Sequence, residues 1–353
     1  MEIEKTVAEN TPPEISVPSS ITLSILSVAF ATTYPTILSC IMSDPDQVFI
    51  SLLAGAFSFL TIPGTNSRIK LIGASVLSLP LFFIVDGYFR AFLIGFLQAY
   101  GQTVAEIHTA HLSLFSFREA ALSQLGILLT MQTCMIFLFL SFLPGFEGVC
   151  KSFIFVFCLI VLEVLAVVLL VPEPPSEMIV SNNLNVLYNE VYYALTKLLG
   201  NTPFYHFHRE YTELVDKYNK PRVSVHLKIS TILEKVNISF ISTGVGGLLS
   251  TTTNNIYLII YCSLSMFKWV FSNQHNKEYI ILSTVSVGIV LLTMIVYNVK
   301  PIFIILIGMS LYLVPSSEGY LQLDKYLIGV SNSIRNALGV FVFMILWKEQ
   351  VLG

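Results

Sequence analysis

The stretch from Ser152 to Val171, SFIFVFCLIVLEVLAVVLLV, carries one charged residue, Glu163, in an otherwise apolar run. A helix needs about 20 mostly apolar residues to cross the hydrocarbon core of a bilayer, so this stretch predicts a membrane span. The rest of the chain is similar, since 54% of its 353 residues are hydrophobic, only 12% are charged, and the mean hydropathy is +0.75. We therefore expect a multi-pass protein of the cell membrane, surrounded by the lipid bilayer.

Comparable apolar runs bounded by charges, Pro-Gly pairs or polar clusters recur along the chain. They predict eleven spans, near 20–41, 47–63, 69–86, 90–115, 120–143, 152–171, 229–249, 254–271, 279–298, 301–315 and 326–347. A polar segment after the sixth span separates two groups of spans. The expected organisation is a disordered N-terminal tail (1–19), a six-helix bundle (20–171), a linker (172–228) and a C-terminal bundle (229–353).

The linker contains a segment with helical periodicity, NVLYNEVYYALTKLLG. Its Leu187, Val191, Leu195 and Leu198 recur at steps of three and four residues, which predicts an amphipathic helix. Such a helix lies on the membrane surface or covers the bundle.

The distribution of basic residues predicts the orientation, because cytoplasmic loops are enriched in Lys and Arg. With a cytoplasmic N-terminus, the outer segments hold only Arg90, Lys151, Lys300 and Lys348. The inner segments hold Lys5, Arg68, Lys70, Arg118, Lys197, Arg209, Lys217, Lys220, Arg222, Lys228, Lys277 and Lys325. We therefore expect the N-terminus and the linker to be cytoplasmic, which leaves the C-terminus outside if the number of spans is odd.

Several functional classes are disfavoured by composition and motifs. A net charge of -3 offers no excess of positive charge for a nucleic-acid partner. The five cysteines lack the paired spacing of a zinc site, and neither a phosphate-binding loop nor a nucleophile elbow is found. We therefore expect that the protein is not an enzyme and uses no cofactor or metal. Transport driven by a gradient is the function that remains.

Ionisable residues inside predicted spans are costly and therefore mark candidate functional sites. Glu106 lies in the fourth span, FLIGFLQAYGQTVAEIHTAHLSLF, where small and polar residues share one helical face. Those residues are Gln102, Thr103, Glu106, Ala110 and Ser113. The neighbouring His108 and His111 are candidates for proton shuttling or for hydrogen bonds between helices.

Glu163 and Arg335 each require a partner from elsewhere in the chain. Glu163 has no polar neighbour on its own helix, so it either hydrogen-bonds a facing helix as a neutral acid or takes part in proton coupling. Arg335 stays charged and needs a carboxylate or an anionic substrate. An ion pair between Arg335 and either Glu106 or Glu163 is the structural alternative.

Four motifs together resemble those of the reduced folate carrier and thiamine transporter family, solute carrier family 19, a branch of the major facilitators. These are Pro63-Gly64-Thr65-Asn66-Ser67-Arg68-Ile69-Lys70, Thr103-Val104-Ala105-Glu106-Ile107, Phe204-Tyr205-His206-Phe207 and Ile328-Gly329-Val330-Ser331-Asn332. The first has Thr65 at the family's Asp position, and Tyr34-Pro35-Thr36-Ile37 keeps only the proline of the family's first-span motif. The family's twelfth span has no counterpart here.

The resemblance implies an all-α, two-bundle transporter of 11 to 12 transmembrane helices that works by alternating access. Folate carriers have Arg where this chain has Glu106, whereas thiamine transporters have Glu, so the resemblance favours uptake of thiamine or a related organic cation. Two alternatives remain open, a folate carrier of the same family using Arg335 and a non-transporting membrane receptor or scaffold. The candidate substrate-binding residues are Glu106, Gln102, Tyr34, Tyr100, Asn332 and Arg335, and the candidate proton-coupling residues are His108, His111 and Glu163.

Overall fold

The computed structural model describes residues 19–42, 44–57, 66–112, 118–175, 177–178, 187–199, 211–212 and 325–352. Every regular element within these ranges is a helix, as the predicted membrane spans imply. The predicted spans at 229–249, 254–271, 279–298 and 301–315 lie outside the described residues, as does most of the linker.

Most of the described helices overlap the other predicted spans. The described helices are α2 (Ser19–Phe30), α3 (Thr33–Ile41), α4 (Pro45–Gly55), α5 (Ser67–Ser78), η2 (Leu79–Phe82), α6 (Tyr88–Leu112), α7 (Arg118–Phe142), α8 (Phe146–Cys150), α9 (Phe153–Leu170), α11 (Leu187–Leu199) and α18 (Lys325–Leu352). Of these, α8 and α11 lie outside the predicted spans. The predicted first span is two helices, because α2 and α3 are bent by 41° at a break.

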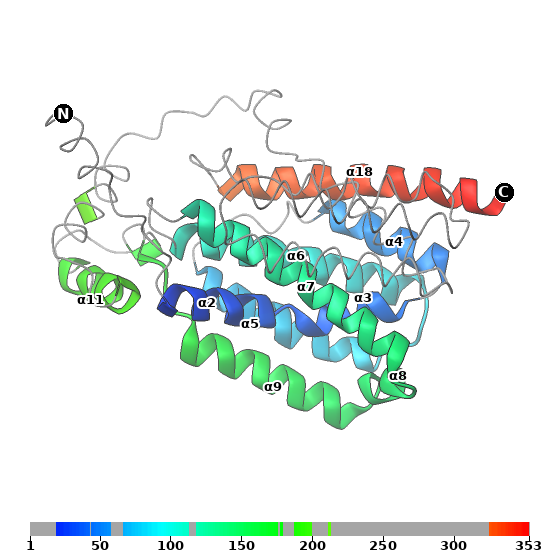
Figure 1. Cartoon of the computed structure of the whole chain (residues 1–353), viewed down its shortest axis with the longest axis horizontal. Coiled ribbons are helices and arrows are strands. Elements are labelled where there is room, and N and C mark those ends of the chain that lie inside the picture. Colours follow the sequence, from blue (N-terminus) through cyan, green and yellow to red (C-terminus); the bar gives the residue numbers. More distant parts are fainter. Residues whose placement is uncertain are drawn as a thin grey trace, which may run out of the picture.

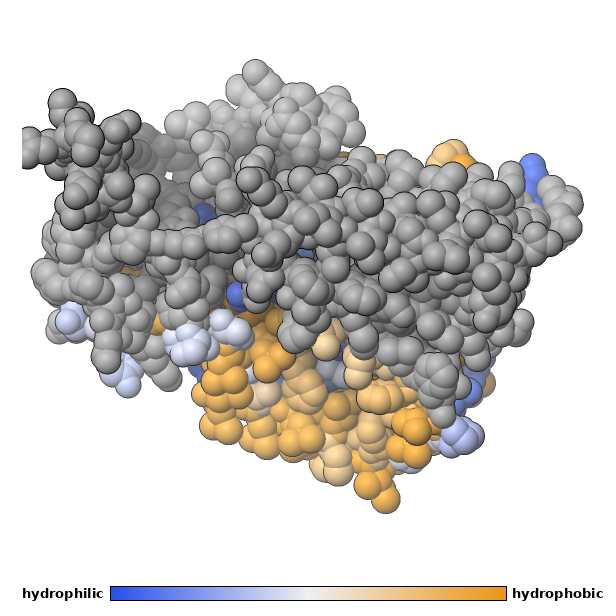
Figure 2. Space-filling model, viewed as in Figure 1, coloured by the Kyte–Doolittle hydropathy of each residue, from blue (hydrophilic) through white to orange (hydrophobic). Residues whose placement is uncertain are grey.

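Helix α9 has the length and composition of a membrane-crossing helix, and so do α2 and α3 when they are taken together as one bent span. The buried residues of α9, which are Val156, Ile160, Glu163 and Val167, recur at steps of three and four and form one stripe. The opposite face is exposed and apolar, and it forms the orange surface along the lower edge of Figure 2. This face suits contact with lipid, which places Glu163 on the protein side of the helix.

The helices pack as a bundle with α9 on one side and α18 on the other (Figure 1). Helices α2 and α5 pack on α9, and α18 packs on α4 and α6. A helix from the last part of the chain therefore lies directly against helices from the first half.

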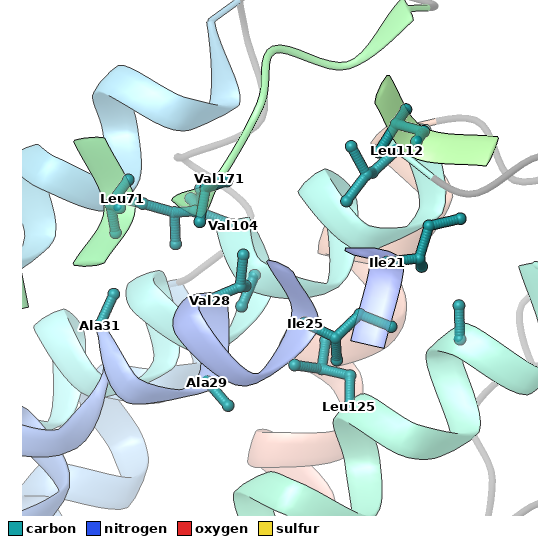
Figure 3. Close-up of a cluster of buried hydrophobic side chains, with 14 of the residues drawn as sticks. Ile21, Ile25, Val28, Ala29, Ala31, Leu71, Val104, Leu112, Leu125 and Val171 are labelled. Atoms are coloured by element: carbon teal, nitrogen blue, oxygen red, sulfur yellow. The ribbon is translucent and has the colours of Figure 1, made fainter. Parts of the chain in front are cut away.

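The interior around α2 is filled by aliphatic side chains (Figure 3). Ile21, Ile25 and Val28 of α2 lie among Leu71 of α5, Val104 of α6 and their neighbours. Because lipid is as apolar as these side chains, close packing rather than exclusion of water supplies most of the attraction between membrane helices.

Helix α11 is the amphipathic helix of the linker segment, and it packs against the start of α2. Val191, Leu195 and Leu198 are buried there. The Ser20 hydroxyl donates a hydrogen bond of 2.6 Å to the Leu198 carbonyl and ties the two helices together.

Candidate functional site

The side chain of Glu106 lies between α6 and α18 and is contacted by two residues of α18. The Asn332 amide donates a hydrogen bond of 2.8 Å to Oε2 of Glu106, and Nη1 of Arg335 lies 3.6 Å from Oε1. Both oxygens of the carboxylate therefore face donors from one helix. The structure thus pairs Arg335 with Glu106, one of the two ion pairs considered from the sequence.

Helical spacing on both partners produces this arrangement. Thr103 precedes Glu106 by one turn on α6, and Asn332 precedes Arg335 by one turn on α18. Residues three apart share a helix face, so the polar face of α6 lies against the polar face of α18. The Asn332 amide also lies 3.2 Å from the Thr103 hydroxyl, so it contacts both residues of α6.

A further contact ties α18 to α4. The Asn336 amide donates a hydrogen bond of 3.0 Å to the Gly55 carbonyl, and a Cβ at Gly55 would lie 3.1 Å from the same amide nitrogen. Sequence reasoning did not single out Asn336. The available signal was its four-residue spacing from Asn332, which places both amides on one face of α18.

The Glu106 and Arg335 side chains remain partly accessible, with 19% and 22% of their surfaces exposed. A charge-assisted hydrogen bond normally measures about 2.7 to 2.9 Å, so the separation of 3.6 Å is that of a loose ion pair. Nε of Arg335 has no hydrogen-bond partner among the described residues. The pair therefore retains capacity to bind another polar group.

The predicted aromatic residues lie in different surroundings. The Tyr34 ring is 1% exposed and packs in an apolar cluster with Ile37, Leu38 and others, so it presents no open face in this conformation. Tyr100 is half-buried and stacks on Phe96, with ring centroids 6.2 Å apart. Gln102 is half-buried, one turn before Glu106 on α6.

His108 belongs to a second polar cluster, at the start of α5. Its Nδ1 lies 2.8 Å from the Ser67 hydroxyl, and its ring is fully buried. The amides of Asn66 and Ser67 both donate to Oε2 of Glu177, over 3.1 and 3.0 Å. His108 thus links α6 to the start of α5, and the structure keeps it apart from the contacts of Glu106. His111, one turn later, is half-buried.

Glu163 lies at the break between α2 and α3. Its Oε1 accepts a hydrogen bond of 2.8 Å from the backbone amide of Tyr34, and its side chain is fully buried. The structure therefore gives this acid a backbone partner on a facing helix rather than the Arg335 side chain.

Comparison with known proteins identifies the fold. No protein-family model matches the chain, and no curated protein matches it in sequence. The xylose transporter XylE from E. coli, in a partially occluded inward-open conformation, is similar in structure, with a TM-score of 0.51 at 14% identity over 93% of this chain and 97% of that one.

Two further structures agree. A double-tryptophan variant of XylE matches with a TM-score of 0.52 at 12% identity, over 94% of this chain and 87% of that one. The human organic anion transporter MFSD10 matches with a TM-score of 0.50 at 11% identity, over 94% of this chain and 92% of that one. The chain therefore has the fold of these transporters.

Proposed function

We propose that this chain, which has the fold of major facilitator transporters, is a secondary-active carrier that takes up thiamine or a related organic cation. The observation that carries the proposal is the partly accessible carboxylate of Glu106, held between α6 and α18. Carriers of this kind bind substrate between their two halves and alternate access by rocking. Glu106 lies where α6, from the first half of the chain, meets α18, from its last part.

The chemistry of the site suits a cation that exchanges with Arg335. A substrate cation would replace the guanidinium as the partner of Oε1, while Asn332 keeps Oε2 in place. The half-buried Tyr100 ring lies on the same helix as Glu106 and is the better placed of the two tyrosines for stacking on a cationic ring. The likeness of the Thr103 to Ile107 segment to the thiamine branch of solute carrier family 19 adds support.

A second candidate is the uptake of an organic anion such as folate. Arg335 favours it, because its guanidinium is partly accessible and Nε lacks a partner among the described residues. The names of the structural neighbours do not separate the candidates, because one transports a sugar and another an organic anion. A receptor or scaffold without transport activity is the third reading.

Uptake of labelled thiamine and labelled folate into proteoliposomes containing the purified chain tests the proposal. We expect saturable thiamine uptake that unlabelled thiamine suppresses, and little folate uptake. Folate uptake without thiamine uptake would favour the anion carrier. If the chain neither binds nor takes up either vitamin, the receptor or scaffold hypothesis would remain.

A further inference from the structure

Pro35 explains why the first span is broken. Proline has no amide hydrogen, and its ring collides with the carbonyl four residues earlier, which here is Ala31. Accordingly α2 ends at Phe30 and α3 begins at Thr33. The break leaves the amides of Thr33 and Tyr34 and the carbonyl of Ala31 to find partners elsewhere, because unpaired backbone groups are costly inside a membrane.

Three neighbouring helices supply these partners. The Ser75 hydroxyl of α5 donates a hydrogen bond of 2.9 Å to the Ala31 carbonyl. Glu163 of α9 accepts a hydrogen bond from the Tyr34 amide. Gln132 of α7, with its side-chain amide oriented to satisfy both neighbours, accepts from the Thr33 amide over 3.1 Å and donates to a carbonyl of α2 over 3.2 Å. The break is therefore a specific junction with its backbone groups paired.

Glu163 is the ionisable member of this junction, and it is incompletely bonded. Its second oxygen, Oε2, is buried without a hydrogen-bond partner among the described residues. The Ser75 hydroxyl lies beside the carboxyl but donates its proton to Ala31. An ionised aspartate or glutamate only accepts hydrogen bonds, and a protonated one also carries an O–H donor. Because Oε2 accepts no hydrogen bond from a described residue, a proton can bind it without displacing one.

Within the part of the chain that the structure describes, the helices that pack on α9 place no cation in contact with Glu163. Their ionisable residues are Tyr34 and Cys40 on α3, Arg68 and Lys70 on α5, and Glu147 and Cys150 on α8, whereas α2 and η2 carry none. Arg68 donates to the Val168 carbonyl, and Glu147 pairs with Lys151 over 2.5 Å. The Tyr34 amide, at the positive end of α3, favours an ionised Glu163.

We propose that Glu163 is a proton-binding site that controls the bend between α2 and α3. The ionised carboxylate holds the Tyr34 amide strongly, which fixes the start of α3 against α9. A proton that enters from water binds Oε2, weakens this hydrogen bond and lets α3 change its angle to α2, and its release to water restores the bond. If the proposed carrier function holds, the proton is the ion that drives uptake.

A distance measurement on the full chain in lipid nanodiscs tests this proposal. Spin labels at the exposed Leu23 on α2 and at Ile41, the end of α3, report the bend. We expect the distance between the labels to change between neutral and acidic pH. Glu163→Gln should abolish the change, because the neutral amide cannot titrate. Glu147→Gln, at an exposed glutamate on α8, should retain it.

An infrared titration provides the second readout, since a protonated carboxyl has its own C=O stretching band. We expect a buried-carboxyl band that rises on acidification and is lost in Glu163→Gln. If Glu163→Gln does not fold, Glu163→Asp replaces it, and a band that shifts with this change assigns the proton to residue 163.

Three results would overturn the proposal: a distance that ignores pH in the parent, a pH response that survives in Glu163→Gln, or a band that is the same in parent and variant. Neither readout uses a substrate, so absence of thiamine uptake would refute the proposed function and leave this inference standing.

Discussion

The side-chain amide of Asn332 donates a hydrogen bond of 2.8 Å to the carboxylate of Glu106, although 226 residues separate the two along the chain. The bond joins α6 to α18 at a partly buried position. Hydrogen bonds between membrane helices contribute only about 0.6 kcal/mol on average, up to about 2 kcal/mol. Contacts of this strength hold one conformation while still allowing the helices to separate, as alternating access requires.

Glu106→Gln tests the assignment of the substrate. The amide keeps the shape of the side chain and can still accept from Asn332, but the charge is lost. A cation should lose a charge-assisted interaction of about 1.5 to 3 kcal/mol, which is roughly ten- to a hundredfold in affinity. Thiamine binding to the purified chain measures this, with the exposed Glu147→Gln as the matched control. Unchanged thiamine affinity in a well-folded Glu106→Gln protein would remove the main support for the cation.

Arg335→Ala tests whether the guanidinium mainly balances Glu106. Removing one partner leaves a partly buried carboxylate without its counter-charge, so the yield of folded protein should fall. The double variant Arg335→Ala, Glu106→Gln should recover much of that yield, because the uncompensated charge is gone. Size-exclusion profiles of the detergent-solubilised proteins provide the measurement. Normal folding of Arg335→Ala with selective loss of folate uptake would instead support the anion carrier.

Gly95→Ala should destabilise the bundle. A Cβ at this position would lie 2.0 Å from the carbonyl oxygen of Ser51 and 2.5 Å from its carbon, so α4 and α6 would have to separate. Overpacking of this kind typically costs about 1 to 3 kcal/mol. Gly73→Ala is the control, because a Cβ there meets nothing within 4 Å, and it should be neutral or slightly stabilising. Thermal unfolding in detergent compares the two, and equal stabilities would contradict the close contact.

The orientation predicted from the basic residues can be tested with a tag in the segment 172–228. If that segment is cytoplasmic, an antibody should reach the tag only after the cells are permeabilised. A cysteine placed there should likewise resist a membrane-impermeant reagent in intact cells. Labelling without permeabilisation would reverse the topology.

Much of the fold could be predicted from the sequence because membrane helices are long and apolar. The stretch from Ser152 to Val171 predicts a membrane span without reference to the rest of the chain, and α9 occupies Phe153–Leu170. Glu106 could be found because a charged residue within such a run is rare and costly. The chemistry of proline predicts a break at Pro35, although the apolar run 20–41 by itself predicts one continuous span.

The sequence by itself determined that Glu106, Glu163 and Arg335 need partners inside the protein, because each carries an ionisable group in an apolar run. Only the tertiary structure decided which partners they have. Arg335 lies beside Glu106 rather than Glu163 because α18 packs on α6, while α9 lies on the other side of the bundle. Glu163 accepts instead from the Tyr34 amide, which is available because Pro35 breaks the helix. Such pairings depend on how distant helices pack and are aligned, and no local periodicity specifies that alignment.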